Sequence, residues 1–218
     1  LNVLVMKRNS DPFAHTLTKP LRTPQGLVIR RIEQRDIRSL CILYRAASLQ
    51  MTFYSRRNHK TYNEIVHHSE PPVEKEHAFW NEQIRGWRSK PVTARRTQYY
   101  FIFNPKKEIV GIIQLYWQHG KPTLGYFTSP QHRGKGYMKE AIQCFTKIAS
   151  AVHHHTPLTA TANTTNHASH RILRHAGFNL LGSTRRGRNV ENGNGNLERR
   201  NFRPYLRVRH LPRKTSTL

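Results

Sequence analysis

The chain has 218 residues, of which 37 are Lys or Arg and 12 are Asp or Glu, so its formal net charge at pH 7 is +25 and its pI is near 11.1. Its apolar runs all fall short of the roughly 18 residues of a membrane-spanning helix, and its two cysteines cannot form a disulfide framework or a cysteine-based zinc site. Because so high a charge destabilises a compact chain, we expect association with a polyanion such as RNA, the alternative being a basic proteome or an unusual solvent.

The residue pattern predicts one domain with the element order β-α-α-β-β-β-α-β-α-β-β. A basic extension at 1–26 has no sustained period, so we expect it to lie on another surface or to be disordered. The expected strands are 27–32, two that flank a turn at 104–108 within 98–117, then 123–127, 158–162, 178–181 and 197–208, before a basic tail at 210–218. The expected helices begin at Asp36, Pro71, Tyr137 and Asn166, the last two ending near Val152 and at Gly177. Cys41 and Cys144 fall on apolar helix faces and are expected to be buried free thiols.

One short segment combines glycine spacing with positive charge. Residues 131–137 read Gln-His-Arg-Gly-Lys-Gly-Tyr and join the apolar run at 124–127 to an expected helix. Glycines let backbone N–H groups point at one spot, the helix N-terminus adds partial positive charge, and Arg133 and Lys135 add full charges. The segment therefore predicts a pyrophosphate cradle, although Gly-x-Gly after an apolar run also occurs by chance in a plain corner turn.

Two ordered motifs resemble those of a known superfamily. Gln131, Gly134 and Gly136 match in register the acetyl-CoA signature of the GNAT N-acetyltransferases, Gln/Arg-x-x-Gly-x-Gly/Ala. Residues 166–178 resemble the Asn-x-Ala-Ser…Leu-x-x-x-Gly-Phe block of the branch that contains the RimJ/RimL ribosomal-protein-alanine acetyltransferases. The resemblance covers about residues 27–208. It implies an α/β (α+β) fold: a single domain at 27–209 whose central, mixed, mostly antiparallel twisted sheet has splayed middle strands and helices on both faces.

The resemblance also implies where acetyl-CoA, or CoA, binds. Backbone N–H groups of 131–136 would hold the pyrophosphate, and the strand ending at Thr128 would leave its neighbour and pair with the pantetheine arm. The implied cofactor-binding residues are Phe127, Thr128, Gln131, His132, Arg133, Gly134, Lys135, Gly136, Tyr137 and Asn166. The implied catalytic residues are Ser169, as a donor to the leaving thiolate, and Tyr205, as the aromatic residue of the final strand. Asn166 has an equal claim as a helix cap, and Ser169 as a plain first-turn residue.

The acidic residue that many relatives carry on the central strands has no counterpart here. Gln114 stands at that place, and the one carboxylate between residues 109 and 190 is Glu140, which we expect to face solvent. The remaining candidates for a general base are His119, His167, Glu82 and a water. A surface with a net charge of +25 also lowers the pKa of a nearby amine, which reduces the need for a base.

Arginines crowd the C-terminal part of the chain around a Gly/Asn-rich turn at 192–196. A run of one sign favours a phosphate-facing surface, with a solvated face as the alternative. The expected RNA-binding residues are Arg185, Arg186, Arg188, Arg199, Arg200, Arg203, Arg207 and Arg209. The three consecutive histidines at 153–155 cannot all reach one ion, so no metal site is expected.

Alternative functions from different classes remain. One is an acetyl-CoA-dependent N-acetyltransferase that acts on a protein amine, such as a ribosomal protein N-terminus, in an RNA-rich setting. The other is a structural subunit of a ribonucleoprotein such as a mitochondrial ribosome, bound to rRNA through its basic surface, with or without CoA. A toxin that acetylates charged tRNA is a third class. The first residue is Leu and not Met, which fits a fragment or a mature chain whose N-terminal targeting segment was removed. Together with the basic charge, this favours an intracellular protein that is not secreted, with the mitochondrial matrix as the expected compartment.

Overall fold

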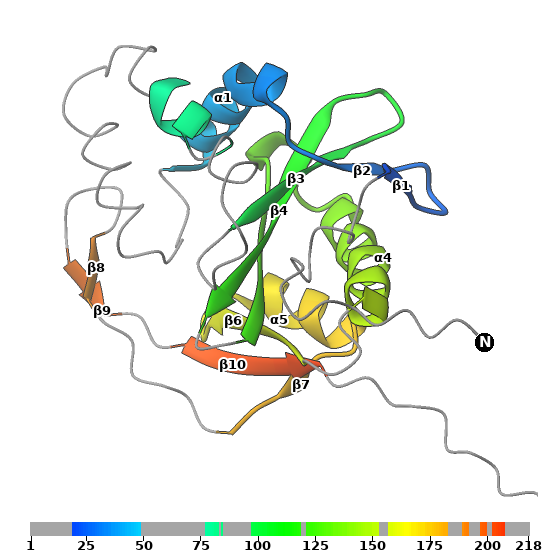
Figure 1. The fold of residues 1–218 in the computed structure, drawn as a ribbon. Helices are drawn as coiled ribbons and strands as arrows, with labels where there is room; N and C mark the ends of the chain where they lie inside the picture. Colours follow the sequence, from blue (N-terminus) through cyan, green and yellow to red (C-terminus); the bar gives the residue numbers. More distant parts are fainter. Residues whose placement is uncertain are drawn as a thin grey trace, which may run out of the picture.

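The computed structural model describes residues 19–48, 77–82, 84, 97–118, 121–152, 157–182, 189–191, 197–199 and 202–207. An eight-stranded sheet with the strand order β1-β2-β3-β4-β5-β6-β10-β7 forms its centre (Figure 1). The strands of this sheet are β1 (Leu21–Arg22), β2 (Val28–Arg31), β3 (Gln98–Phe103), β4 (Ile109–Gln118), β5 (Lys121–Thr128), β6 (Leu158–Asn163), β7 (Asn179–Leu180) and β10 (Phe202–Arg207). A separate two-stranded sheet pairs β8 (Asn189–Glu191) with β9 (Leu197–Arg199). The helices are α1 (Ile37–Ser48), α4 (Tyr137–Val152) and α5 (His167–His175), with 3₁₀ turns η1 (Gln34–Asp36) and η2 (Pro130–His132), and residues 77–82 and 84 are also helical.

The two middle strands of the sheet separate halfway along their length. All neighbouring pairs are antiparallel except β5 and β6, which pair in parallel only at Thr123 with Thr159 and at Leu124 with Ala160. The two threonine hydroxyls hydrogen-bond at 2.8 Å and fix this short register. Beyond Leu124, β5 stays with β4 while β6 follows β10 to its end. The predicted mixed, mostly antiparallel sheet with splayed middle strands is confirmed.

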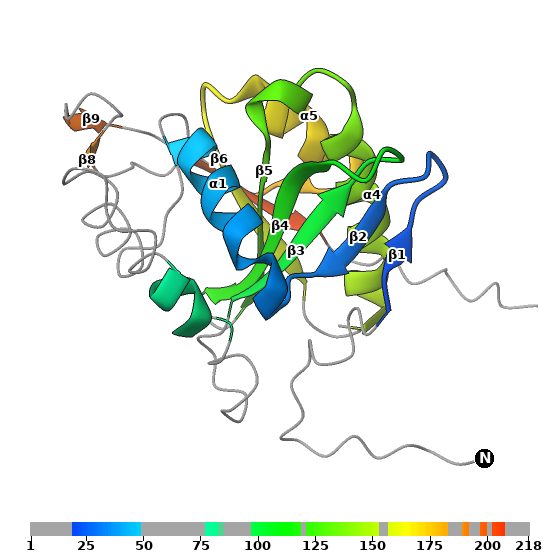
Figure 2. The same ribbon diagram turned by 90° about the horizontal axis from the view of Figure 1, so that it is seen from above.

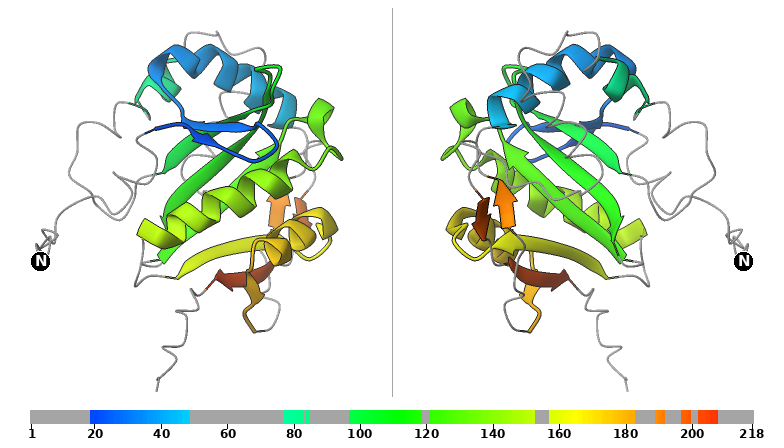
Figure 3. Two further views of the ribbon diagram at one scale, coloured as in Figure 1. Left: turned by 90° about the vertical axis from the view of Figure 1, so that its right-hand side faces the viewer. Right: turned by 90° about the vertical axis from the view of Figure 1, so that its left-hand side faces the viewer.

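Helices cover both faces of the sheet. On one face α1 and the helical residues 77–82 and 84 enclose a core that contains Trp80 (Figure 2). On the other face α4 and α5 enclose a second core that contains Phe145 (Figure 3). Strand β3 serves both cores because successive side chains of a strand point to opposite faces: Phe101 packs towards α1 and Ile102 towards α4.

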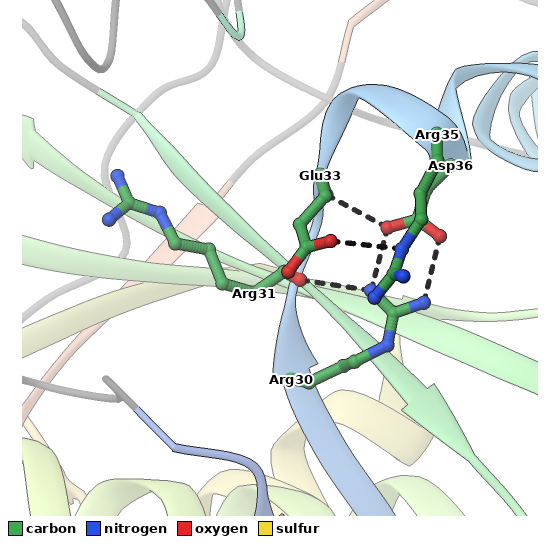
Figure 4. Close-up of polar contacts among 5 residues, drawn as sticks. All are labelled: Arg30, Arg31, Glu33, Arg35 and Asp36. Carbon is green, nitrogen blue, oxygen red and sulfur yellow. Dashed lines mark hydrogen bonds and ion pairs between the residues drawn. The ribbon is translucent and has the colours of Figure 1, made fainter.

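An ion pair fixes the turn from β2 into α1. Arg30 meets Asp36 at two points, Nη1 to Oδ2 at 2.6 Å and Nη2 to Oδ1 at 2.8 Å (Figure 4). The backbone N–H of Glu33 also donates to Asp36 Oδ2, at 2.8 Å. Burial alone would raise the pKa of Asp36, but the hydrogen bonds from Arg30 and Glu33 outweigh it, so that the pKa is lowered. The prediction that Asp36 is the cap from which the first helix starts is wrong in detail, because Glu33 holds the N-cap position of η1 and Asp36 closes that turn from within.

Two boundaries differ from those predicted, both through pairing that local pattern does not reveal. Residues 19–26 belong to the folded body and not to a free extension, because β1 pairs with β2 and Thr23 exchanges backbone hydrogen bonds with Gly26 and Leu27. The single strand expected at 197–208 is two strands, since β9 pairs with β8 whereas β10 pairs with β6 and β7. The other predicted strands, and the helices that begin at Tyr137 and near Asn166, form within one or two residues of the expected bounds.

The burial of the two cysteines agrees with the prediction at one position and differs at the other. Cys41 is a buried free thiol as predicted, whereas Cys144 is only half-buried, and burial raises the pKa of its thiol.

Trp80 is a core residue, while Trp87 and the side chain of Trp117 lie outside the described part of the chain. Of the helices that the structure describes, none has the length and apolar character to cross a bilayer.

Candidate active site

Strand β5 passes into helix α4 through a tight turn at residues 129–136. The N–H of Ser129 donates to Val110 O on β4 at 2.9 Å, so the turn starts while the chain is still bound to the sheet. The N–H of His132 then donates to Ser129 O at 2.9 Å, and the first helical bond runs from Glu140 N–H to Gly136 O at 3.2 Å. Within the described residues, no hydrogen bond occupies the backbone N–H groups of residues 134–136.

Two glycines give this turn its shape and leave its inner side open. Gly134 and Gly136 have φ angles of 76° and 79°, a region that other L-residues rarely adopt. A Cβ atom at either position would have no heavy atom within 4 Å. Free N–H groups at a helix N-terminus, beside the exposed residues Arg133 and Lys135, form an arrangement that suits a phosphate. The turn therefore fits the pyrophosphate of CoA.

The predicted cofactor residues on and beside the turn fall into exposed, buried and half-buried groups. The exposed residues Gln131, Arg133, Gly134, Lys135 and Gly136 lie on the open turn. Phe127 packs in the core beside α1, and His132 lies buried beneath the turn with its ring 6.3 Å from that of Tyr137. Thr128 and Tyr137, both half-buried, stand at the two ends of the turn. The side chains of Phe127 and His132 are therefore buried and do not lie on the open surface of the turn, and His132 Nδ1 has no hydrogen-bond partner in the described part of the chain.

The first turn of α5 lies against the splayed half of β5. Asn166 caps the helix by accepting from the N–H of Ser169 at 3.0 Å, which confirms the predicted capping role. Tyr126, two residues beyond the last pairing of β5 with β6, donates its hydroxyl to Ser169 O at 3.3 Å. Burial raises the pKa of Tyr126, so this phenol stays protonated as a donor. Ser169, half-buried, is thereby held from both sides at the splay.

Tyr205 is buried and already engaged. It is 1% exposed, pairs with Ala160 on β6, and its hydroxyl is hydrogen-bonded to Nδ1 of His170. His170 is itself buried, and its Nε2 has no partner among the described residues. Sequence reasoning missed His170, because its only signal was its place next to Ser169. Tyr205 is thus hydrogen-bonded to the residue that follows Ser169 on α5.

The residues considered as a general base differ in burial and in whether they already have a hydrogen-bond partner. Glu140 does not face solvent as predicted: it is 9% exposed and its Oε1 accepts from the N–H of Gln25 at 2.8 Å, because the turn between β1 and β2 folds over α4. Gln114 is a buried residue of β4. His167 and Glu82 are exposed, and His119 lies outside the described residues. Within the part of the chain that is described, no carboxylate forms a hydrogen bond with Ser169.

Most of the arginines predicted to bind RNA lie outside the described residues. Arg199, Arg203 and Arg207 belong to β9 and β10 by their backbone alone, and Arg185, Arg186, Arg188, Arg200 and Arg209 are not described. RNA binding by these residues stays a prediction. The histidines at 153–155 are likewise outside the described ranges, and among the residues inside them no group of three His, Cys, Asp or Glu side chains could hold a metal ion.

Known proteins provide an independent comparison. A family model described as Acetyltransferase (GNAT) domain matches residues 27–179. No curated protein sequence matches the chain. Among solved structures, RimL, the ribosomal L7/L12 alpha-N-protein acetyltransferase in complex with coenzyme A, superposes with a TM-score of 0.62 and 16% identity over 87% of this chain and 98% of its own.

Two further solved structures resemble this chain with slightly lower TM-scores. One is the Salmonella typhimurium acetyltransferase that modifies the N-terminal serine of the 50S ribosomal subunit protein L7/L12, with a TM-score of 0.59 and 15% identity over 88% of this chain and 100% of its own. The other is the spermidine N-acetyltransferase of Vibrio cholerae, with a TM-score of 0.57 and 14% identity over 84% and 93%. At these identities the likeness concerns the fold.

Proposed function

The chain belongs to the GNAT family of acetyltransferases, enzymes that use acetyl-CoA, and from this premise we propose that it acetylates the α-amine of a protein in an RNA-rich setting, such as a ribosomal protein N-terminus. The observation that carries the proposal is the open, glycine-shaped turn at 129–136, set at the end of β5 where that strand has left β6. The comparisons give no support to the alternative of a structural ribonucleoprotein subunit.

The turn and the splay bind the two parts of the cofactor. When bound, acetyl-CoA supplies an activated acyl thioester. Backbone N–H groups of residues 134–136 donate to its pyrophosphate, and the positive end of the α4 dipole strengthens these bonds. The part of β5 that ends at Thr128 has no β6 neighbour, so it offers a free strand edge to the pantetheine arm.

Helix α5 supplies the hydroxyl group that would stabilise the leaving thiolate of CoA, that of Ser169. The hydroxyl of Ser169 would donate a hydrogen bond to this thiolate while the thiolate takes up the proton that the attacking amine releases, and Asn166 and Tyr126 hold the Ser169 backbone in position. Tyr205 would act as a positioning residue, since its hydroxyl bonds His170, the residue next to Ser169. On this proposal Ser169 is the catalytic residue of the predicted pair.

The choice of amine follows from the lack of a carboxylate hydrogen-bonded to Ser169 in the described part of the chain; the described carboxylate of Glu108 interacts instead with His132 and Lys135 of the cofactor turn. An α-amine has an ordinary pKa of about 7.7–8.0 and a lysine of about 10.4, so at pH 7.5 roughly a quarter of α-amines but only about one lysine in a thousand is neutral. An enzyme without a strong base therefore works best on an α-amine. A net charge of +25 also repels a polyamine such as spermidine.

The experiment compares three acceptors with the purified full chain and acetyl-CoA at pH 7.5. The acceptors are a peptide with a free N-terminus, the same peptide with a blocked N-terminus and one internal lysine, and spermidine, with mass spectrometry as the readout. We expect the free α-amine to be acetylated at least about a hundredfold faster, in line with the difference in neutral amine. Equal rates on lysine or spermidine would refute the choice of α-amine, and CoA binding without transfer to any acceptor would refute the enzymatic role.

A further inference from the structure

A basic pocket opens on the side of α5. Five residues line it, and its volume is about 280 Å³. The lining residues are Thr164, His167, His170, Arg171 and Arg174. His167, Arg171 and Arg174 follow one another at spacings of four and three residues, which places them on one stripe of the helix. None of the five belongs to the turn at 129–136, so the pocket is distinct from that turn.

The positive charges of this pocket have no protein partner in the described part of the chain. Neither Arg171 nor Arg174 forms an ion pair there, and both are exposed. The nearest carboxylate in sequence is that of Glu191, whose side chain lies outside the described part of the chain, and the next, Glu140, accepts from the N–H of Gln25. Two adjacent arginines that repel each other are stabilised when an anion lies between them.

A residue that lines the pocket also has a polar atom without a partner. His170 is 7% exposed and lines the pocket, while its Nε2 is buried without a hydrogen bond among the described residues. When Tyr205 donates to His170 Nδ1, the ring carries its proton on Nε2, which is then a further donor beside the pocket. A buried donor of this kind is costly unless it has a hydrogen-bond partner, which a ligand in the pocket would supply.

We infer that this pocket binds a phosphoryl group, held by Arg171, Arg174 and His167, with His170 as a further donor in the pocket lining. A phosphate presents three or more oxygens, which matches the number of converging donors better than the two oxygens of a carboxylate. The excess positive charge of the whole chain favours a phosphate-bearing ligand over a neutral one. No pocket residue belongs to the cofactor turn, and although His170 also bonds Tyr205, phosphate binding here does not require that acetyl transfer occurs.

The test follows the histidine rings, since a chain with 37 Lys and Arg binds phosphate weakly at many places. Inorganic phosphate is titrated into the full-length chain at constant ionic strength, and the ring nitrogens of His167 and His170 are observed by NMR. We expect a saturable shift, and substitutions Arg171→Gln and Arg174→Gln should each weaken the affinity on the order of tenfold. Arg38→Gln is the matched control, an exposed arginine on α1 that should leave the affinity unchanged.

Three outcomes would overturn the inference: no shift with phosphate, an equal shift with acetate, or an affinity that Arg171→Gln and Arg174→Gln leave unchanged. The source of the phosphoryl group is resolved by titrating adenosine monophosphate, a short RNA, and CoA against its 3′-dephospho form. A stronger shift with the RNA identifies a backbone phosphate, and one with CoA alone identifies the 3′-phosphate of the cofactor. A chain that binds phosphate here but transfers no acetyl group would refute the proposed function and leave this site intact.

Discussion

Replacing Gly134 with alanine isolates the role of the open turn. The chain offers a matched control in Gly182, which also has a positive φ angle, 65° against 76°, and also has no heavy atom within 4 Å of an added Cβ. Gly182 lies after β7 and is far in sequence from the turn. Gly134→Ala and Gly182→Ala therefore impose the same kind of backbone strain at two places, only one of which is proposed to bind CoA.

The expected loss of stability in both variants and the expected loss of CoA affinity in Gly134→Ala follow from the conformation and surroundings of the two glycines. Forcing alanine into the left-handed region costs about 1–2 kcal/mol, partly offset by about 0.4–1 kcal/mol from the stiffer unfolded chain. Each variant should therefore lose about 1 kcal/mol of stability, which lowers the melting temperature of a domain of this size by about 2–4 °C. At Gly134 the new methyl group also enters the space in which N–H groups meet the pyrophosphate. Loss of one such bond to a charged group, about 1.5–3 kcal/mol, weakens CoA binding by roughly 10- to 100-fold.

Calorimetry measures both quantities on the same samples, with thermal scans for stability and titration with CoA for affinity. The expected result is a similar loss of melting temperature in the two variants and a loss of CoA affinity in Gly134→Ala alone. Equal CoA affinity in the two variants would show that the turn does not hold the pyrophosphate. That result would remove the observation on which the proposed function depends.

Three further substitutions or conditions test other parts of the fold. Asp36→Asn should cost about 2 kcal/mol in urea unfolding by weakening the pair with Arg30. Because the pKa of Asp36 is lowered, the wild type should lose this stabilisation as the pH falls below 3.8, whereas Asp36→Asn should not. Gly111→Ala places a Cβ 2.4 Å from Phe127 O, so we expect a loss of about 1–3 kcal/mol or failure to fold; an unchanged melting temperature would contradict the packing. Burial raises the pKa of Tyr116 to about 12, so its stabilisation should be complete below pH 10.0 and decline towards pH 12, and a phenol titrating near 10.0 in an ultraviolet titration would contradict its burial.

Local pattern was enough to predict the elements that surround the cofactor turn. Helix α4 begins and ends where its apolar stripe predicts, because a helix that covers a sheet must repeat its apolar residues every three to four positions. The cap at Asn166 and the left-handed residue at Gly177 likewise follow from the side chains themselves. These features depend on neighbours within a few residues along the chain.

Apart from the cap at Asp36, whose partners are local, the features that sequence reasoning missed depend on distant partners. Glu140 is held by Gln25, which lies 115 residues away in the sequence, and nothing near Glu140 in the sequence indicated that it would not face solvent. Tyr205 finds His170 across 35 residues only because β10 runs beside β6 beneath α5. The break between β9 and β10 likewise reflects different pairing partners and not a change of composition.

The excess of positive charge and the lack of a carboxylate base in the described part of the site are connected. A chain with 12 acidic residues among 218 has few carboxylates to place, and one of them, Glu140, holds the turn between β1 and β2. The positive field that remains favours the neutral form of a nearby amine, so it performs part of the work of a base. Salt screens this field over about 8 Å at physiological ionic strength, so only an acceptor held close to the surface gains from it. An acceptor that arrives on a phosphate-rich particle is both attracted and held close, whereas a free polyamine is repelled.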